Sequence, residues 1–251
     1  LDRNGNVVKP FNIKLPMSSD PLPLAVFDYD NNRNYRFLIA QDRFLFMYNN
    51  QGKRLNGFTL KKVNSKIISP PKHIRLQRKD YILISLEDNT LKIVSRTGKD
   101  RVKVKGKIAF NNNEIFSYLN TFVTTDQEGN LIQVDTKGNK VVSPLNLAPN
   151  NRIDATTKTL VTLSENILNI KGVPVELPFG SYTTPKIFYL NNTLYFSITD
   201  TIEQKVYLFY SNGKLVEGFP VYGKSAVDLA NSDKDKALEM VVATENNSLL
   251  I

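Results

Sequence analysis

The stretch Asp135-Thr136-Lys137-Gly138-Asn139-Lys140-Val141 follows the apolar segment Leu131-Ile132-Gln133-Val134 and decides the fold. An apolar strand ends, a polar turn with a glycine follows, and a second short apolar segment leaves the turn. The same arrangement occurs in Tyr210-Ser211-Asn212-Gly213-Lys214-Leu215-Val216. Because one local pattern recurs far along the chain, the sequence indicates a repeat architecture.

The turn returns about every forty residues, with its glycine at Gly5, Gly52, Gly98, Gly138, Gly172 and Gly213. Successive glycines are separated by 47, 46, 40, 34 and 41 residues, and 43 residues join the last to the first through the chain ends. Six units therefore fill the chain. A period of about 40–50 residues with four short strands in each unit is typical of a β-propeller. We expect an all-β, six-bladed propeller.

The apolar segments have the length and composition of strands. They are short and rich in Val, Ile, Phe, Tyr and Leu, as Leu24–Phe27, Tyr35–Ala40 and Arg43–Tyr48 show in the first unit. Helical spacing is not evident anywhere. No linker divides the sequence, so we expect residues 1–251 to form a single domain.

The two chain ends complement each other. The last unit stops at Leu249-Leu250-Ile251, without a fourth strand, whereas the chain begins with the turn Asn4-Gly5 and the segment Asn6-Val7-Val8. Pairing of these terminal strands would close the ring in one shared blade. The segment Leu1–Gly5 reads as the end of a strand and a turn rather than as a signal peptide, and we expect the chain to be part of a longer protein.

Composition excludes several classes of protein. The chain has no cysteine, so it has no disulfide, thiol nucleophile or thiolate metal site. A chain without cysteine folds in either an oxidising or a reducing compartment, so this absence does not indicate where the protein resides. No apolar run approaches the roughly 18 residues that span a bilayer. The formal net charge is +9, and residues 53–107 alone hold 16 Lys or Arg against 4 acidic residues. Such asymmetry can mark an anion-binding face.

Two segments resemble a known repeat. The loop Asp28-Tyr29-Asp30-Asn31-Asn32 and the run Asn231–Thr244, with its Glu239-Met240-Val241-Val242 strand, resemble bacterial FG-GAP or VCBS propeller repeats and their quinoprotein-like (WD40-like) relatives. The outer segment Ser211–Val221 is similar to the same group. The resemblance implies a propeller in a bacterial envelope or secreted protein.

The resemblance also implies a possible metal site, because family loops of the form Asp-x-Asp-Gly-Asp-Gly hold Ca²⁺. The matching candidates are Asp28, Asp30, Asp233 and Asp235, whose spacing places hard oxygen ligands at i and i+2. Neither loop contains a glycine, and Asn and Lys replace ligand positions. The competing interpretation is a polar loop whose side chains bond the turn backbone. We expect little or no Ca²⁺ binding there, and no cofactor.

A basic segment provides a second candidate site. Period-two spacing places Arg101, Lys103 and Lys105 on one face of an outer strand and Val102 and Val104 on the other. These cations could bind a polyanion. Alternatively, they protect a sheet edge against aggregation, which is the interpretation we favour. Aromatic stacking partners are sparse in this region, so nucleic acid is not favoured as the partner.

Catalytic motifs are missing. His73 is the single histidine, and it lies in Pro70-Pro71-Lys72-His73-Ile74-Arg75, at the start of an expected inner strand and among cations. We interpret it as an ordinary strand residue and assign no catalytic residue. The absence of Trp argues against a sialidase Asp box and against quinoprotein dehydrogenases.

The sequence therefore favours a non-enzymatic binding or scaffolding propeller with a protein or carbohydrate partner. One alternative is a hydrolase or lyase that uses carboxylates in the central channel. The other is a polyanion-binding module that uses the basic blade.

Overall fold

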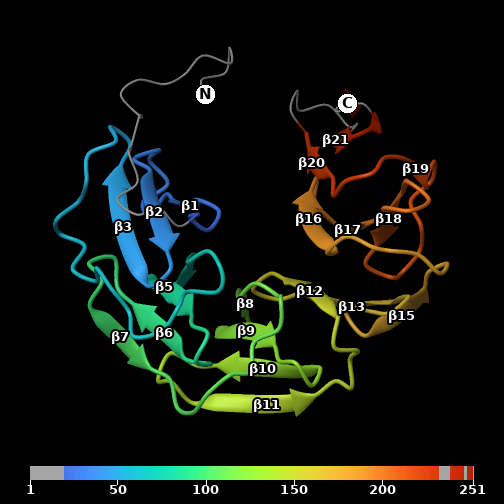
Figure 1. Cartoon of the computed structure of the whole chain (residues 1–251). Coiled ribbons are helices and arrows are strands. Elements are labelled where there is room, and N and C mark those ends of the chain that lie inside the picture. Colours follow the sequence, from blue (N-terminus) through green and yellow to red (C-terminus); the bar gives the residue numbers. More distant parts are fainter. Residues whose placement is uncertain (1–19, 232–237, 246–247, 251) are drawn as a thin grey trace. The chain divides into compact units, whose positions relative to one another are not determined.

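The structure is a computed structural model that describes residues 20–231, 238–245 and 248–250. Every named element in this part of the chain is a β-strand, and the strands form six antiparallel sheets (Figure 1). The all-β prediction is confirmed. The predicted pairing of residues 6–8 with 247–251 falls largely outside the described residues, so closure of a six-bladed ring stays a prediction.

The first three sheets follow one another along the chain. The first comprises β1 (Ala25–Phe27), β2 (Arg36–Gln41) and β3 (Phe44–Asn49). The second comprises β4 (Lys72–Leu76), β5 (Lys79–Ser85), β6 (Leu91–Val94) and β7 (Asp100–Lys103). The third comprises β8 (Phe116–Tyr118), β9 (Thr121–Thr125), β10 (Asn130–Val134) and β11 (Lys140–Pro144).

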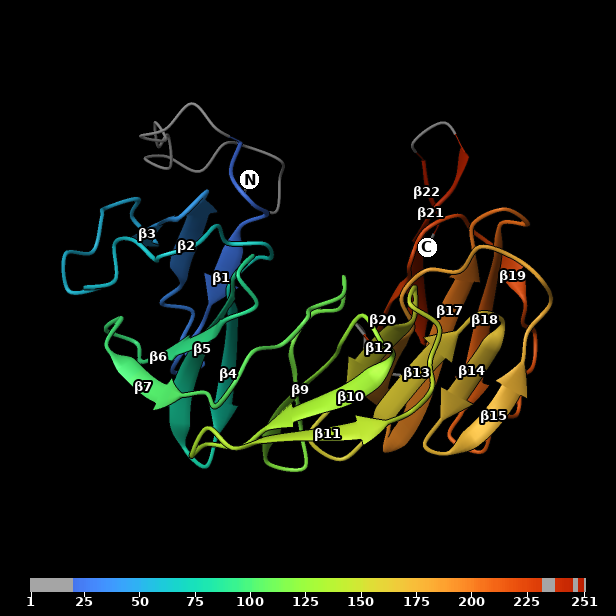
Figure 2. The ribbon, with the colours of Figure 1, turned by 60° about the horizontal axis from the view of Figure 1, so that its bottom comes forward.

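The other three sheets repeat the same order. The fourth comprises β12 (Arg152–Ala155), β13 (Leu160–Ser164), β14 (Ile167–Ile170) and β15 (Val173–Glu176), which lie side by side in Figure 2. The fifth comprises β16 (Lys186–Leu190), β17 (Thr193–Asp200), β18 (Lys205–Tyr210) and β19 (Val221–Tyr222). The sixth comprises β20 (Asp228–Ala230), β21 (Glu239–Ala243) and β22 (Leu249–Leu250).

Within the described residues, the glycine turns recognised in the sequence follow the third strand of their sheets. Four of them share one hydrogen-bond pattern: the first N–H donates to the carbonyl four residues later, and the glycine N–H donates back to the first carbonyl. These turns span residues 49–53, 95–99, 135–139 and 210–214. Their glycines have φ angles between 71° and 86°, a region that residues with a Cβ atom rarely adopt. The sequence repeat is thus a repeat of backbone geometry.

Three of these glycines, Gly98, Gly138 and Gly213, also pack closely against the segment that follows or forms the outer edge of the preceding sheet. A Cβ atom on Gly98 would lie 2.7 Å from the backbone nitrogen of Leu60, and one on Gly213 would lie 2.9 Å from Cγ2 of Val175. A Cβ atom on Gly138 would overlap the carbonyl oxygen of Lys103, at the end of β7. Close backbone approach therefore requires glycine here for a second reason, beyond the φ angle.

The chain groups into two compact units. Of the described residues, the first unit contains 20–110, 120–122 and 132–142, and the second contains 111–119, 123–131 and those from 143 onward. In the first unit, side chains of two sheets share one core, in which Leu38 and Met47 pack with Ile82 and Val94. This sharing explains why β5 is buried on both faces and reads as a continuous apolar run.

The second unit is built in the same way. One core joins Val161 and Leu168 of the fourth sheet to Phe196 and Phe209 of the fifth. A second core joins Val206 and Leu208 of the fifth sheet to Leu229 and Val242 of the sixth. The sheets within each unit are thus held together by apolar side chains from their facing surfaces.

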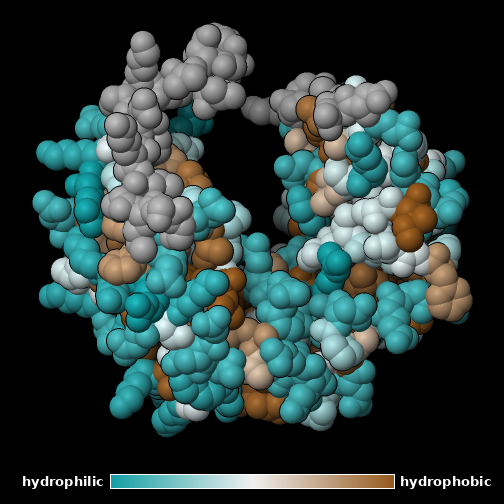
Figure 3. Space-filling model, in the orientation of Figure 1, coloured by the Kyte–Doolittle hydropathy of each residue, from teal (hydrophilic) through white to brown (hydrophobic). Residues whose placement is uncertain are grey.

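Hydrophilic side chains predominate in the space-filling view of Figure 3. Within the described residues, no helix is long and apolar enough to cross a membrane.

Candidate functional site

The second sheet bears a cleft of about 710 Å³, which we call the basic cleft. It lies between the segment after β3 and the outer half of the sheet. Its apolar lining consists of Leu60, Val63, Leu86, Leu91, Val102 and Val104. Four of these six side chains are buried, so the floor of the cleft belongs to the core and is preformed.

Cations from three neighbouring segments surround this floor. They are Lys62, Lys92, Arg101 and Lys103. Two acidic residues also line the cleft, but each is already paired: Asp100 lies 2.6 Å from Nζ of Lys92, and Asp88 lies 2.9 Å from Nζ of Lys107. The hydrogen bond from Lys107 holds the pKa of Asp88 below its usual value. Lys62, Arg101 and Lys103 have no ion pair with any described carboxylate and supply the net positive charge.

The structure separates the three cations that the sequence placed on one face. Arg101 and Lys103 are exposed, and Val102 between them is buried, as period two predicts. The guanidinium of Arg101 lies 5.4 Å from the ring centroid of Tyr81. The strand ends at Lys103, however, and Nζ of Lys105 donates a 2.7 Å hydrogen bond to Oδ1 of Asn139. Lys105 does not line the cleft.

His73 lies at the second position of β4, as the sequence indicated. Its Nε2 is 2.8 Å from Oδ1 of Asp80, a buried residue at the start of β5. The other carboxylate oxygen of Asp80 accepts a 2.6 Å hydrogen bond from Nε of Arg96, which follows β6. The ring of Tyr29 packs edge-on against the ring of His73, with 4.8 Å between the ring centroids. Sequence reasoning found the cations around His73 but missed Asp80 and Tyr29, which only strand pairing and packing bring there.

Burial and the carboxylate act in opposite directions on His73. Burial lowers the pKa of the imidazole, the hydrogen bond to Asp80 raises it, and the net effect is a lowered pKa. Burial would raise the pKa of Asp80, but hydrogen bonds from Arg96 and His73 outweigh this effect and hold the pKa below its usual value. A neutral histidine that hydrogen-bonds an ionised aspartate is therefore the favoured state.

The loop that carries Asp28 and Asp30 is satisfied by protein groups. Oδ1 and Oδ2 of Asp28 accept the backbone N–H groups of Asn32 and Arg33 at 3.2 Å and 3.0 Å. Oδ1 of Asp30 lies 2.9 Å from NH1 of Arg96. Asp233 and Asp235 lie outside the described residues. Within the part of the chain that is described, no group of three or more His, Asp or Glu side chains could hold a metal ion.

The second unit has a pocket of about 510 Å³ beside β8, β12 and β16, the first strands of their sheets. Two carboxylates line it, Glu114 and Asp154. The two carboxylate oxygens of Asp154 accept backbone hydrogen bonds: Oδ1 from the N–H of Ala155 at 2.7 Å, and Oδ2 from the N–H of Ile187 at 2.8 Å. Asp154 thus connects β12 to β16, which gives its carboxylate a structural role.

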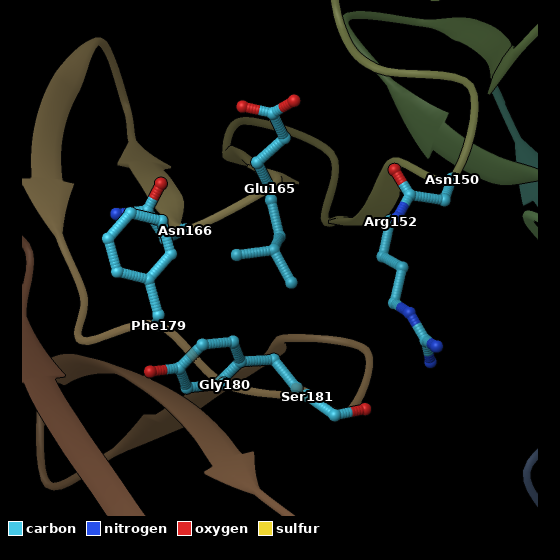
Figure 4. A pocket seen from close by; sticks show the side chains of 9 residues that line it. Asn150, Arg152, Glu165, Asn166, Phe179, Gly180 and Ser181 are labelled. Atoms are coloured by element: carbon cyan, nitrogen blue, oxygen red, sulfur yellow. The ribbon is translucent and has the colours of Figure 1, made fainter.

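A smaller pocket of about 280 Å³ lies in the same unit. We call it the Phe179 pocket. Figure 4 shows Phe179 and Asn166 on one side and Asn150 and Arg152 on the other, with Glu165 above and Gly180 and Ser181 below. Nothing in the sequence pointed to this pocket, because the loop of Phe179 lies outside the glycine repeat.

Comparisons with known proteins identify the fold but no family. No protein-family model matches the chain, and no curated protein matches its sequence. The resemblance to FG-GAP or VCBS repeats therefore stays a prediction.

Three solved structures are similar to the chain in backbone. The computationally designed protein Ika8 has a TM-score of 0.59 at 13% identity, covering 93% of this chain and 70% of that one. BBS1N, in its complex with ARL6DN, has a TM-score of 0.60 at 13% identity, covering 93% and 78%. A catalytically inactive virginiamycin B lyase from Staphylococcus aureus, with Quinupristin, has a TM-score of 0.59 at 14% identity, covering 95% and 86%.

At such identities the likeness shows the fold alone. BBS1N and the lyase have propeller-type folds built from antiparallel sheets. The glycine turns, the repeated sheets and these neighbours agree, and the chain has an all-β, propeller-like fold.

Proposed function

We propose that the chain is a non-enzymatic binding module that takes an acidic, extended segment of a protein partner into the basic cleft. The observation that carries this proposal is the combination of a largely buried apolar floor with three cations at its rim, Lys62, Arg101 and Lys103, that have no ion pair with any described carboxylate. An apolar floor favours side chains that leave water, and the cations favour carboxylates beside them. A segment that alternates acidic and apolar residues presents both chemistries at the spacing of an extended chain.

A protein segment fits the cleft better than nucleic acid does. Single-stranded nucleic acid binds where aromatic side chains stack on successive bases. The lining of the basic cleft contains no aromatic residue. The likeness to BBS1N, which was solved in a complex with the protein ARL6DN, is compatible with a protein partner.

The test uses a short fluorescent peptide that alternates Glu with Val, titrated with the protein and followed by anisotropy. Salt is held at about 0.15 M, where the Debye length is about 8 Å and diffuse attraction is largely screened. We expect saturable binding that Lys103→Glu weakens by roughly tenfold, equivalent to about 1.4 kcal/mol. A peptide with Gln in place of Glu should bind correspondingly less well.

Lys105→Glu provides the matched control, because it makes the same charge change two residues away but outside the cleft lining. We expect it to leave peptide binding unchanged. Equal loss of binding in both variants would mean that net charge alone attracts the peptide. Tighter binding of heparin or single-stranded DNA than of the peptide at this salt concentration would favour the polyanion-binding alternative.

A further inference from the structure

The Phe179 pocket combines an aromatic ring that is almost fully exposed with polar side chains that have no hydrogen bond or ion pair to any residue the structure describes. The side chain of Phe179 is 91% exposed, the highest exposure among the large hydrophobic residues that the structure describes. A single exposed apolar residue is ordinary on a protein surface. Two further features distinguish Phe179: the rigidity of its loop and the chemistry of its neighbours.

The loop that carries Phe179 is tethered on both sides. On the N-terminal side, Leu177 is buried. Its N–H donates to the backbone carbonyl of Asn166 at 2.8 Å, and its carbonyl accepts a hydrogen bond from Nδ2 of Asn166 at 3.1 Å. The buried Tyr182 donates its hydroxyl to the carbonyl of Pro178 at 2.6 Å. Burial and the nearby Asp200 raise the pKa of Tyr182 to about 12, so this hydroxyl keeps its proton.

On the C-terminal side, the loop joins the end of β17. The carbonyl of Ser181 accepts the N–H of Thr201 at 2.7 Å, and a Cβ atom on Gly180 would overlap the carboxylate of Asp200. Asp200 is fully buried, so the loop cannot move toward it without a clash. The loop therefore holds Phe179 outward, and a ligand that contacts its ring causes little further loss of conformational entropy in the loop.

The polar neighbours supply both donors and acceptors. Asn150, Arg152 and Glu165 line the pocket from two other loops. Their side chains make no hydrogen bond or ion pair with any residue that the structure describes. Asn166 uses its Nδ2 on the carbonyl of Leu177, which orients its amide and leaves Oδ1 available as an acceptor.

We propose that the Phe179 pocket binds a neutral saccharide of one or two rings. A pyranose ring has an apolar C–H face and a rim of hydroxyl groups. The negative face of an aromatic ring attracts the C–H face, and hydroxyl groups need side chains that donate and accept at short range, as amides, carboxylates and guanidinium groups do. Glu165 disfavours an anionic sugar, and Arg152 disfavours a cationic one. The pocket volume of about 280 Å³ lies just below the ligand-pocket range of about 300–1,000 Å³, which favours a small ligand.

This site is distinct from the basic cleft, because it lies in the second unit and none of its lining residues lines the cleft. The saccharide proposal therefore goes beyond the proposed function. Its failure would leave peptide binding at the cleft untouched.

The experiment is saturation-transfer difference NMR on the full chain with glucose, N-acetylglucosamine, maltose, cellobiose and N,N′-diacetylchitobiose as probes. We expect transfer to at least one of them, concentrated on the ring C–H protons of one sugar face. Phe179→Ala should abolish this transfer, and Arg152→Gln should reduce it severalfold. Both residues are exposed, so neither variant threatens the fold.

Tyr189→Ala is the matched control, since Tyr189 is 65% exposed in the same unit but does not line the pocket. We expect this variant to behave like the wild type. Absence of transfer to all five sugars would overturn the proposal. Transfer that survives Phe179→Ala, or that Tyr189→Ala also removes, would overturn it equally.

Discussion

Replacing Gly138 by alanine tests the idea that repeat glycines are required by packing as well as by φ. Gly138 has a φ of 86°, and a Cβ atom there would overlap the carbonyl oxygen of Lys103. The adjacent hydrogen bond from Lys105 N–H to the Gly138 carbonyl, at 2.8 Å, fixes the spacing of the two segments. The left-handed backbone conformation costs alanine about 1–2 kcal/mol relative to glycine. Part of this cost is offset because alanine lowers the conformational entropy of the unfolded chain. Forcing an extra methyl group into a packed site costs about 1–3 kcal/mol more.

Gly172→Ala isolates the first of these effects. Gly172 has a φ of 90°, and nothing lies within 4 Å of the position of its Cβ atom. We therefore expect Gly172→Ala to lower the free energy of unfolding by about 1 kcal/mol and Gly138→Ala by about 2–4 kcal/mol. Urea unfolding followed by far-ultraviolet circular dichroism measures both. Equal losses in the two variants would refute the packing argument and leave φ as the sole reason for the repeat glycine.

Three further predictions concern His73, the core and the acidic loop. Folding lowers the pKa of His73, so the unfolded chain binds a proton more readily than the folded protein. The contribution of His73 to the free energy of unfolding is therefore fully present above the unfolded pKa of about 6.5. It is lost progressively as the pH drops below that value, with a slope of at most about 1.4 kcal/mol per pH unit. His73→Gln should remove this slope between pH 7 and 5 in urea titrations, and an unchanged slope would contradict the assignment. Phe196→Ala, at a fully buried site, should lower the free energy of unfolding by about 3–5 kcal/mol. Phe179→Ala, at an exposed site, should change it by less than about 0.5 kcal/mol. Chemical denaturation measures both, and similar losses in the two variants would contradict the described burial. Millimolar Ca²⁺ should leave the melting temperature unchanged relative to chelator, because Asp28 and Asp30 already have protein partners; a shift of several degrees would reveal a native-state site.

The strands themselves were predictable from local pattern. The expected segments Leu24–Phe27, Tyr35–Ala40 and Arg43–Tyr48 match β1, β2 and β3 to within one residue at each end. Short apolar runs between polar turns carry this information without any knowledge of neighbouring sheets. The alternation of Arg101, Val102 and Lys103 was equally predictable, since period two follows from the strand alone.

The end of that alternation was not predictable. The outer strand stops at Lys103, and pairing with β6 shifts register between Ile93 and Val94. Lys105 then bonds to Asn139, a residue of the next sheet. Because the bulge and the partner both depend on other strands, the sequence could not show which two of the three cations line the cleft.

By itself, the sequence determined the strand segments, the turn glycines and hence the repeat, because these features depend on interactions between residues close together in the chain. Only the tertiary structure decided why Gly138 must be glycine, which carboxylate meets His73, and how Phe179 is presented. Each of these depends on segments distant in sequence: Lys103 for the glycine, Asp80 and Arg96 for the histidine, Asp200 for the loop. Such contacts are set by how sheets pack on one another, and local periodicity carries no record of that packing.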